Sequence, residues 1–216
     1  MSDKQTINET LSQQDKAIIS IAGFAASGEI ESLRNELVKG LDKGLGVDEI
    51  KGVLSQLYAY CGFPRSLNAL GTFMGVVQTR KDAGILDEAA PTKPLNEQIN
   101  PDSLSVGTAN QTKLIGQVVA GPLFDFAPEV DAYLKAHLFG DIFSKTELTW
   151  RQRELATIAA LANLKGAESQ LKSHYFISLN NSVTVEQLHD FVSHVKATFA
   201  PEVGVTAESV LKDTLS

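Results

Sequence analysis

Two residues in the last third of the chain have the types and positions that proton transfer requires. Glu154 and His174 both lie in the stretch ELTWRQRELATIAALANLKGAESQLKSH, residues 147–174. A carboxylate that accepts a hydrogen bond from an imidazole holds one tautomer of the ring and supports it as a proton-transfer group. We therefore expect Glu154 to orient His174. The alternative stays open that Glu154 is a helix-start carboxylate that interacts with the helix dipole or pairs with Arg151.

Three further residues are candidates for the same chemistry. His137 follows Val130, Tyr133 and Leu134 on one apolar helix face, so it either packs in the core or joins the catalytic pair. Arg151 and Arg153 could bind an anionic substrate through bidentate hydrogen bonds. They could equally be solvated charges at the start of a helix.

Metal and thiol chemistry have weak support in the sequence. His189 and His194 are five residues apart, which does not place them on one helix face, and no HxH or HExxH motif occurs. We expect no metal and no cofactor. Cys61 is the single cysteine, so it cannot form an internal disulfide, and we interpret it as a buried structural thiol.

Composition limits the classes of partner. The 216 residues carry a formal charge of −7 without a basic cluster, which argues against nucleic-acid binding. No run of about 18 apolar residues occurs, and the amino terminus lacks the basic-then-apolar pattern of a signal peptide. We expect a cytoplasmic protein that binds a small molecule and does not enter a membrane.

The apolar pattern predicts an all-α fold, because apolar residues recur at helical spacing and no stretch alternates with a period of two. Helix starts are expected at the capping boxes Ser12/Asp15, Thr149/Gln152 and Thr184/Gln187. Other helices are expected at 29–43, from about 47 to 61, at 66–81, at 112–119 and from 128. In the 66–81 helix, Leu67, Leu70, Met74 and Val77 should be buried, and Gly71 and Gly75 should allow close approach of another helix. Residues 82–104, which contain Pro91, Pro94 and Pro101, are expected to be a surface connector.

The chain also repeats itself at an offset of 137 or 138 residues. Gly28 corresponds to Gly166, and Val47 corresponds to Val185. The repeats divide the chain into a first unit at 1–81, a connector at 82–127 and a second unit at 128–216. Glu154 falls opposite Ala17 and His174 falls opposite Glu36, so the second unit would hold the site and the first would be its scaffold.

The motifs RELATIAALA, QLKSH, VTVEQL and YAYCGFPRSLNAL resemble the carboxymuconolactone decarboxylase-like family. That family shares its helical fold with the alkylhydroperoxidase D (AhpD) group, and two tandem copies resemble its double-length members. The resemblance implies an AhpD-like helical bundle that assembles as a homo-oligomer, a trimer or a hexamer. It also implies a cofactor-free enzyme that decarboxylates a small carboxylated lactone or a related acid, with His174 moving a proton.

Two other functions remain open. The peroxidase branch of the group has a Cys-x-x-Cys pair one helical turn before the histidine, and those positions fall here at about Ala167 and Gln170. A dithiol cycle needs both thiols, and neither residue is a cysteine, so the support for a peroxidase-type antioxidant activity is weakened. The third alternative is a helical oligomer without catalytic activity.

Overall fold

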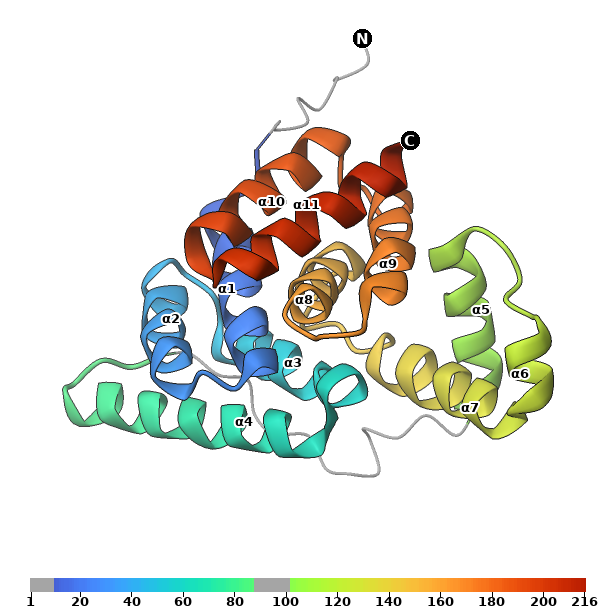
Figure 1. The fold of residues 1–216 in the computed structure, drawn as a ribbon. Coiled ribbons are helices and arrows are strands. Elements are labelled where there is room, and N and C mark those ends of the chain that lie inside the picture. Colours follow the sequence, from blue (N-terminus) through green and yellow to red (C-terminus); the bar gives the residue numbers. More distant parts are fainter. Residues whose placement is uncertain (1–9, 88–101) are drawn as a thin grey trace, which may run out of the picture.

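All the secondary structure in the part of the chain that can be described, residues 10–87 and 102–216, is helical (Figure 1). The structure is a computed structural model, and its helices confirm the all-α prediction. The start of the chain and most of the predicted connector, with Pro91, Pro94 and Pro101, lie outside the described residues. Within them, no helix is both long enough and apolar enough to cross a lipid bilayer.

Two runs of four helices follow the same order. The first run is α1 (Gln13–Ser27), α2 (Ile30–Asp42), α3 (Val47–Gln56) and α4 (Tyr58–Asp82). The second is α8 (Trp150–Ala162), α9 (Glu168–Asn180), α10 (Val185–Thr198) and α11 (Pro201–Leu215). The starts of α8, α9 and α10 lie 137, 138 and 138 residues after the starts of α1, α2 and α3. Helix order alone does not test common origin, so the duplication stays a prediction.

Side-chain caps fix where the first helix of each run begins. Ser12 Oγ accepts a hydrogen bond from the backbone N–H of Asp15 at 3.0 Å, and Thr149 Oγ1 accepts one from that of Gln152 at 3.2 Å. In both boxes the acidic or amide side chain accepts from the cap residue's own N–H, so otherwise unpaired amides are satisfied. Both predicted starts are confirmed, and Gly28, with φ +80°, ends α1 as expected.

The helices α1 and α8 pack against each other, and most of their residues belong to one buried core. Each also contacts the third helix of the other run, α10 against α1 and α3 against α8. In Figure 1 the pair lies inside the bundle, with α10 and α11 above it and α4 below. The two runs therefore share one core.

Polar contacts follow the same crossed arrangement. Gln56 Nε2 on α3 donates to Thr157 Oγ1 on α8 at 2.9 Å, and His194 Nε2 on α10 lies 2.9 Å from Ser20 Oγ on α1. Under the sequence offset, Thr157 corresponds to Ser20 and His194 to Gln56. The two contacts thus occupy corresponding places in the two runs.

A kink divides α4 near its start. Gly62 has φ +80° and ψ 159°, a combination that residues with a Cβ rarely adopt, and Pro64 follows it. The predicted break at this point is confirmed. Of the predicted buried face, Leu70 and Val77 pack partly buried against the core, but Leu67 and Met74 are wrong, being 61% and 73% exposed. The buried stripe is instead Ser66, Ala69, Phe73 and Val76, one residue earlier.

Four short helices form a lobe beside the bundle (Figure 1). They are α5 (Ser103–Ile115), α6 (Pro122–Phe126), α7 (Pro128–Tyr133) and the π-helix η2 (Leu134–Ile142). They pack around a second apolar cluster that includes Leu114, Leu138 and Phe143. The expected helix at 112–119 is wrong, because the helix runs from 103 to 115 and Gly116, at φ +83°, ends it.

The π-helix changes which residues face inward. Its hydrogen bonds span five residues, as from Phe143 N to Leu138 O, so the helix is wider than the α-helix assumed for this stretch. Leu138 is buried, whereas Val130, Tyr133 and His137 are exposed. The single apolar face predicted for this stretch, with His137 in it, is therefore wrong.

Candidate active site

Glu154 lies in the first turns of α8, on the side that faces the core. The Thr149 cap sets the start of the helix, and α8 packs between α1 and α9, so the Glu154 side chain is 0% exposed. Burying a carboxylate is costly unless hydrogen-bond donors reach it. Its contacts therefore decide what the residue can do.

His174 on α9 supplies one of those contacts. Its Nδ1 lies 2.7 Å from Glu154 Oε2, and its side chain is 13% exposed. An ionised carboxylate only accepts hydrogen bonds, so the hydrogen lies on Nδ1 and Nε2 is the nitrogen left for a substrate. The structure thus forms the expected hydrogen bond, while a catalytic role for the pair stays a prediction.

Tyr60, which the sequence reasoning did not single out, also borders this pair. It lies just before the Gly62 kink, and its ring meets that of His174 edge-on at a centroid distance of 5.7 Å. Its hydroxyl is buried, and burial, together with the neighbouring Glu154 carboxylate, raises the pKa of Tyr60. The motif YAYCGFP marked this segment, but no pattern in it showed which aromatic ring would reach His174.

Arg153 is fully buried next to Glu154 in a polar network. Its guanidinium donates to Gln56 Oε1 at 3.1 Å and to the carbonyl oxygen of Lys145 at 3.0 Å, and it lies 3.4 Å from Glu147 Oε1. Burial lowers the pKa of Arg153, and the Glu147 carboxylate partly offsets that effect. These bonds join α8 to α3, so Arg153 has a structural role whatever its role in binding.

Arg151 points to the other side of α8. It forms a bidentate ion pair with Asp15 at 2.7 and 3.2 Å and a longer hydrogen bond to Gln187 Oε1 at 3.3 Å. The open alternative in which Glu154 pairs with Arg151 is therefore not what the structure has. Substrate binding by Arg151 stays a prediction, and it would compete with Asp15.

His137 lies on the exposed side of η2. Its Nδ1 is 2.9 Å from Asp141 Oδ2, its ring is 5.5 Å from that of Tyr58, and its side chain is 52% exposed. The expectation of a core histidine is wrong. Among the described residues, no hydrogen bond or ring contact joins it to Glu154 or His174.

The thiol chemistry of the peroxidase branch has no counterpart around His174. Ala167 caps α9 and Gln170 follows in its first turn, where that branch has its cysteines. Cys61 is half-buried, and its thiol donates to the carbonyl oxygen of Leu57 at 3.1 Å. Burial raises the pKa of the Cys61 thiol, with Arg65 acting in the opposite direction, and this favours the unreactive protonated form.

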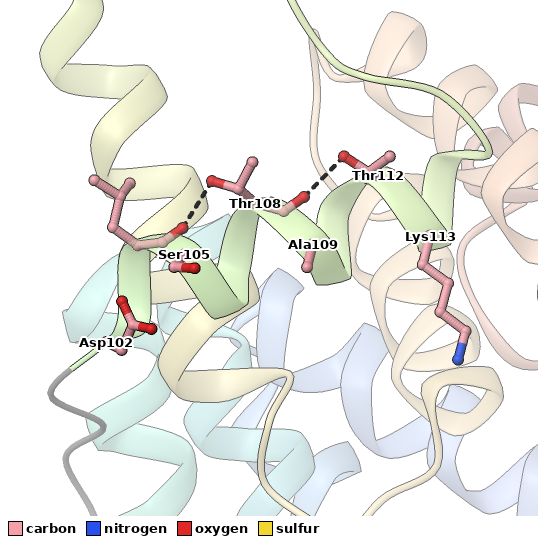
Figure 2. A pocket seen from close by; sticks show the side chains of 7 residues that line it. Asp102, Ser105, Thr108, Ala109, Thr112 and Lys113 are labelled. Carbon is pink, nitrogen blue, oxygen red and sulfur yellow. Dashed lines mark hydrogen bonds between the residues drawn. The ribbon is translucent and has the colours of Figure 1, made fainter.

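Two surface hollows lie away from the pair. One, of about 730 Å³, runs along α5 and is lined by residues such as Ser105, Thr108 and Lys113 (Figure 2). Another lies next to Phe143 and Trp150. The lining of neither hollow includes Glu154 or His174.

No group of three or more His, Cys, Asp and Glu side chains suited to a metal ion occurs in residues 10–87 and 102–216. The prediction of a site without metal or cofactor stays a prediction.

Comparison with known proteins finds a family match that covers α7, the π-helix and most of the second run of helices. Residues 128–212 match the carboxymuconolactone decarboxylase family. A 4-carboxymuconolactone decarboxylase from Acinetobacter baylyi is 32% identical over 72 residues, which are 33% of this chain and 53% of that protein. The chain thus spans about half the length of this curated relative. The all-helical bundle agrees with the fold that the resemblance implied.

Proposed function

Because residues 128–212 match the carboxymuconolactone decarboxylase family, we propose that this chain is a cofactor-free decarboxylase of a small carboxylated lactone or a related acid. The observation that carries the proposal is the 2.7 Å hydrogen bond between the fully buried Glu154 and the mostly buried His174. The similar protein from Acinetobacter baylyi is a decarboxylase by name. That name is a property of the relative and only suggests the reaction here.

In the proposed reaction, His174 moves the proton. The substrate carboxylate leaves as carbon dioxide, and the electron pair of the broken carbon–carbon bond passes into the lactone carbonyl as an enolate. Imidazolium Nε2–H then gives its proton to the carbanionic carbon, and solvent returns one to the ring. Glu154 holds Nδ1–H throughout, so the ring keeps Nε2 toward the substrate.

An arginine would hold the substrate carboxylate in this proposal. Arg153 has one donor, Nε, that is buried without a hydrogen-bond partner, and it neighbours Glu154 in sequence. Arg151 is more exposed but is paired with Asp15. Arg153 could use a free donor, whereas Arg151 would have to exchange a carboxylate partner for the substrate.

The proposal includes a homo-oligomer, a trimer or a hexamer, in the cytoplasm. Its support is the outer face of α4, where Phe63, Leu67 and Met74 are exposed and a Cβ on Gly71 would meet no atom within 4 Å. A second helix could approach closely there. Light scattering would show a lower mass for Leu67→Glu than for Val205→Glu, an equally exposed site on α11, and equal masses would contradict this interface.

A substrate panel tests the reaction. We expect loss of ultraviolet absorbance with a carboxylated lactone, with carbon dioxide released in equal amount, and loss of that turnover in His174→Asn. His189→Asn, on α10, is the matched control and should retain it. Absence of turnover on every carboxylated lactone and related acid would contradict the proposal.

The same preparations separate the rival functions. Thiol-dependent consumption of peroxide that disappears in Cys61→Ser would favour the peroxidase alternative. An intact oligomer with neither activity would favour a protein without catalysis.

A further inference from the structure

The geometry points to Tyr60 as a positioning residue for the Glu154–His174 pair: its hydroxyl donates a hydrogen bond to Glu154 Oε1, the carboxylate oxygen that His174 does not use. The role in catalysis rests on the proposed function, but the contact itself does not. The inference adds a residue from the first helix run to a site whose other members lie in the second.

The proposed contact joins two buried polar atoms. Of the described buried side-chain atoms, Tyr60 Oη and Glu154 Oε1 are among the few without a hydrogen-bond partner. Leaving such groups unpaired costs roughly 1–3 kcal/mol each, and more when one is charged. They are complementary, since a phenol can donate and a carboxylate oxygen accepts.

The two residues meet at the same imidazole. Glu154 bonds to Nδ1 of His174, and the Tyr60 ring packs edge-on against that ring. Tyr60 also contacts both apolar clusters, so its ring is fixed in the seam between the bundle and the lobe. Both groups thus border one imidazole, and the Glu154 carboxylate is close enough for its charge to act on the phenol.

Thr157, the other polar neighbour of the phenol, already forms two hydrogen bonds through its hydroxyl. Its hydroxyl hydrogen goes to the carbonyl oxygen of Arg153 at 2.9 Å, and its oxygen accepts from Gln56 at 2.9 Å. It therefore has no hydrogen to give to Tyr60. The carboxylate is the stronger acceptor, because hydrogen bonds to a charged group are shorter and stronger.

The protonation of Tyr60 suits a donor. Burial raises the pKa of this phenol and the neighbouring carboxylate adds to that effect; together they outweigh a hydrogen bond with Thr157 and the charge of Arg153, which lower it, so the hydroxyl keeps its hydrogen across the working pH range. The other charged groups around it are Arg153 on α8 and Glu147, which lies 3.4 Å from Arg153. Tyr60 thus supplies a hydrogen bond without adding a charge.

The expected result of Tyr60→Phe is a change at His174 without loss of the fold. With one donor fewer, the carboxylate binds Nδ1–H more strongly, and the imidazole Nδ1–H resonance moves downfield in proton NMR of the substrate-free protein. Turnover falls about tenfold at unchanged KM, as expected from the loss of one hydrogen bond to a charged group.

Tyr175→Phe is the matched control. Tyr175 is another buried phenol, but its hydroxyl donates to the carbonyl oxygen of Ala207 at 3.1 Å, away from the pair. Its loss should leave the His174 resonance in place. An unmoved resonance in Tyr60→Phe, or an equal shift in Tyr175→Phe, would overturn the inference.

A second measurement covers a Tyr60→Phe variant that does not fold. In protein labelled with carbon-13 tyrosine, Glu154→Gln should move the Cζ resonance of Tyr60 and leave that of Tyr175, and an unmoved Tyr60 signal would contradict the contact. Both NMR results are obtained without substrate. If His174→Asn remained active, the proposed function would fail while the contact could still stand.

Discussion

Glu154 and His174, twenty residues apart on successive helices, share a 2.7 Å hydrogen bond in which the carboxylate is fully buried. Among the described residues, His174 is the one side chain whose hydrogen bond to this carboxylate is formed in the structure, and Oε1 is the oxygen that we assign to the Tyr60 hydroxyl. Burying the Glu154 carboxylate with so few hydrogen-bond donors costs stability. Activity and stability should therefore respond differently to its removal.

Glu154→Gln tests this relationship. The amide oxygen can still accept from Nδ1–H and carries no charge to bury, so the free energy of unfolding should stay within about 1 kcal/mol of its original value. Turnover should fall by about 100-fold, because the imidazole loses the carboxylate that supports its charged form. Thermal unfolding and initial rates measure the two effects. Glu147→Gln, at the rim of the same network, should retain most activity.

Arg151 and Asp15 separate binding from structure. If Arg151 only joins α8 to α1, then Arg151→Gln and Asp15→Asn break one ion pair and should lower stability equally, by about 1 kcal/mol. If Arg151 also binds the substrate carboxylate, Arg151→Gln alone should raise KM about tenfold or more. Steady-state kinetics on the two variants decides between these outcomes.

His194 should make stability depend on pH. Burial, with Lys16 nearby, lowers the pKa of His194, so the unfolded chain binds a proton more readily than the folded one. Its contribution is present above about pH 6.5, the ordinary value for histidine, and is lost as pH falls through the lower folded value. Melting temperatures from pH 8 to pH 5 should fall.

His194→Gln provides the matched variant for that measurement. Glutamine is the residue at the corresponding place in the first run, where Gln56 bonds to Thr157. At position 194 it can bond to Ser20, so stability at pH 8 should be kept and the decline toward pH 5 reduced. A decline of unchanged size would assign the pH dependence to other groups.

Two glycines should respond in opposite directions to alanine. A Cβ on Gly107 in α5 would overlap the carbonyl oxygen of Lys135, whereas one on Gly71 in α4 would meet open space. We expect Gly107→Ala to lower the free energy of unfolding by about 1–3 kcal/mol. In the Leu67→Glu background, where the proposed oligomer is separated, Gly71→Ala should raise it by up to about 1 kcal/mol, from helix propensity alone. Urea unfolding of both variants gives the comparison.

Local chemistry explains what the sequence could predict. Ser12, Thr149 and Thr184 carry their capping signal within four residues, so the starts of α1, α8 and α10 were predictable. The Glu154–His174 contact was predictable because both residues stand at positions that resemble the family site. Neither inference needed knowledge of distant parts of the chain.

The misplaced features depend on geometry that the sequence does not display. No local sequence pattern predicted the π-helix, and because its turns are wider than those of an α-helix, His137 faces outward. The kink at Gly62 was expected. Which face of α4 turns toward the core after the kink could not be predicted, so the buried stripe was placed one residue late. Tyr60 was missed because its contact with His174 depends on the direction that the chain takes at Gly62, two residues later.

The packing of α1 against α8 has a consequence for how many sites each molecule can carry. Ala17, which corresponds to Glu154, is completely buried, and Glu36 stands where His174 has its counterpart. A carboxylate introduced at Ala17 would enter the shared core without an imidazole to receive it, at a cost that no single replacement offsets. The proposed chemistry would therefore be confined to the second run of helices, and an assembly of these chains would hold one such site per chain, half the number of its helix runs.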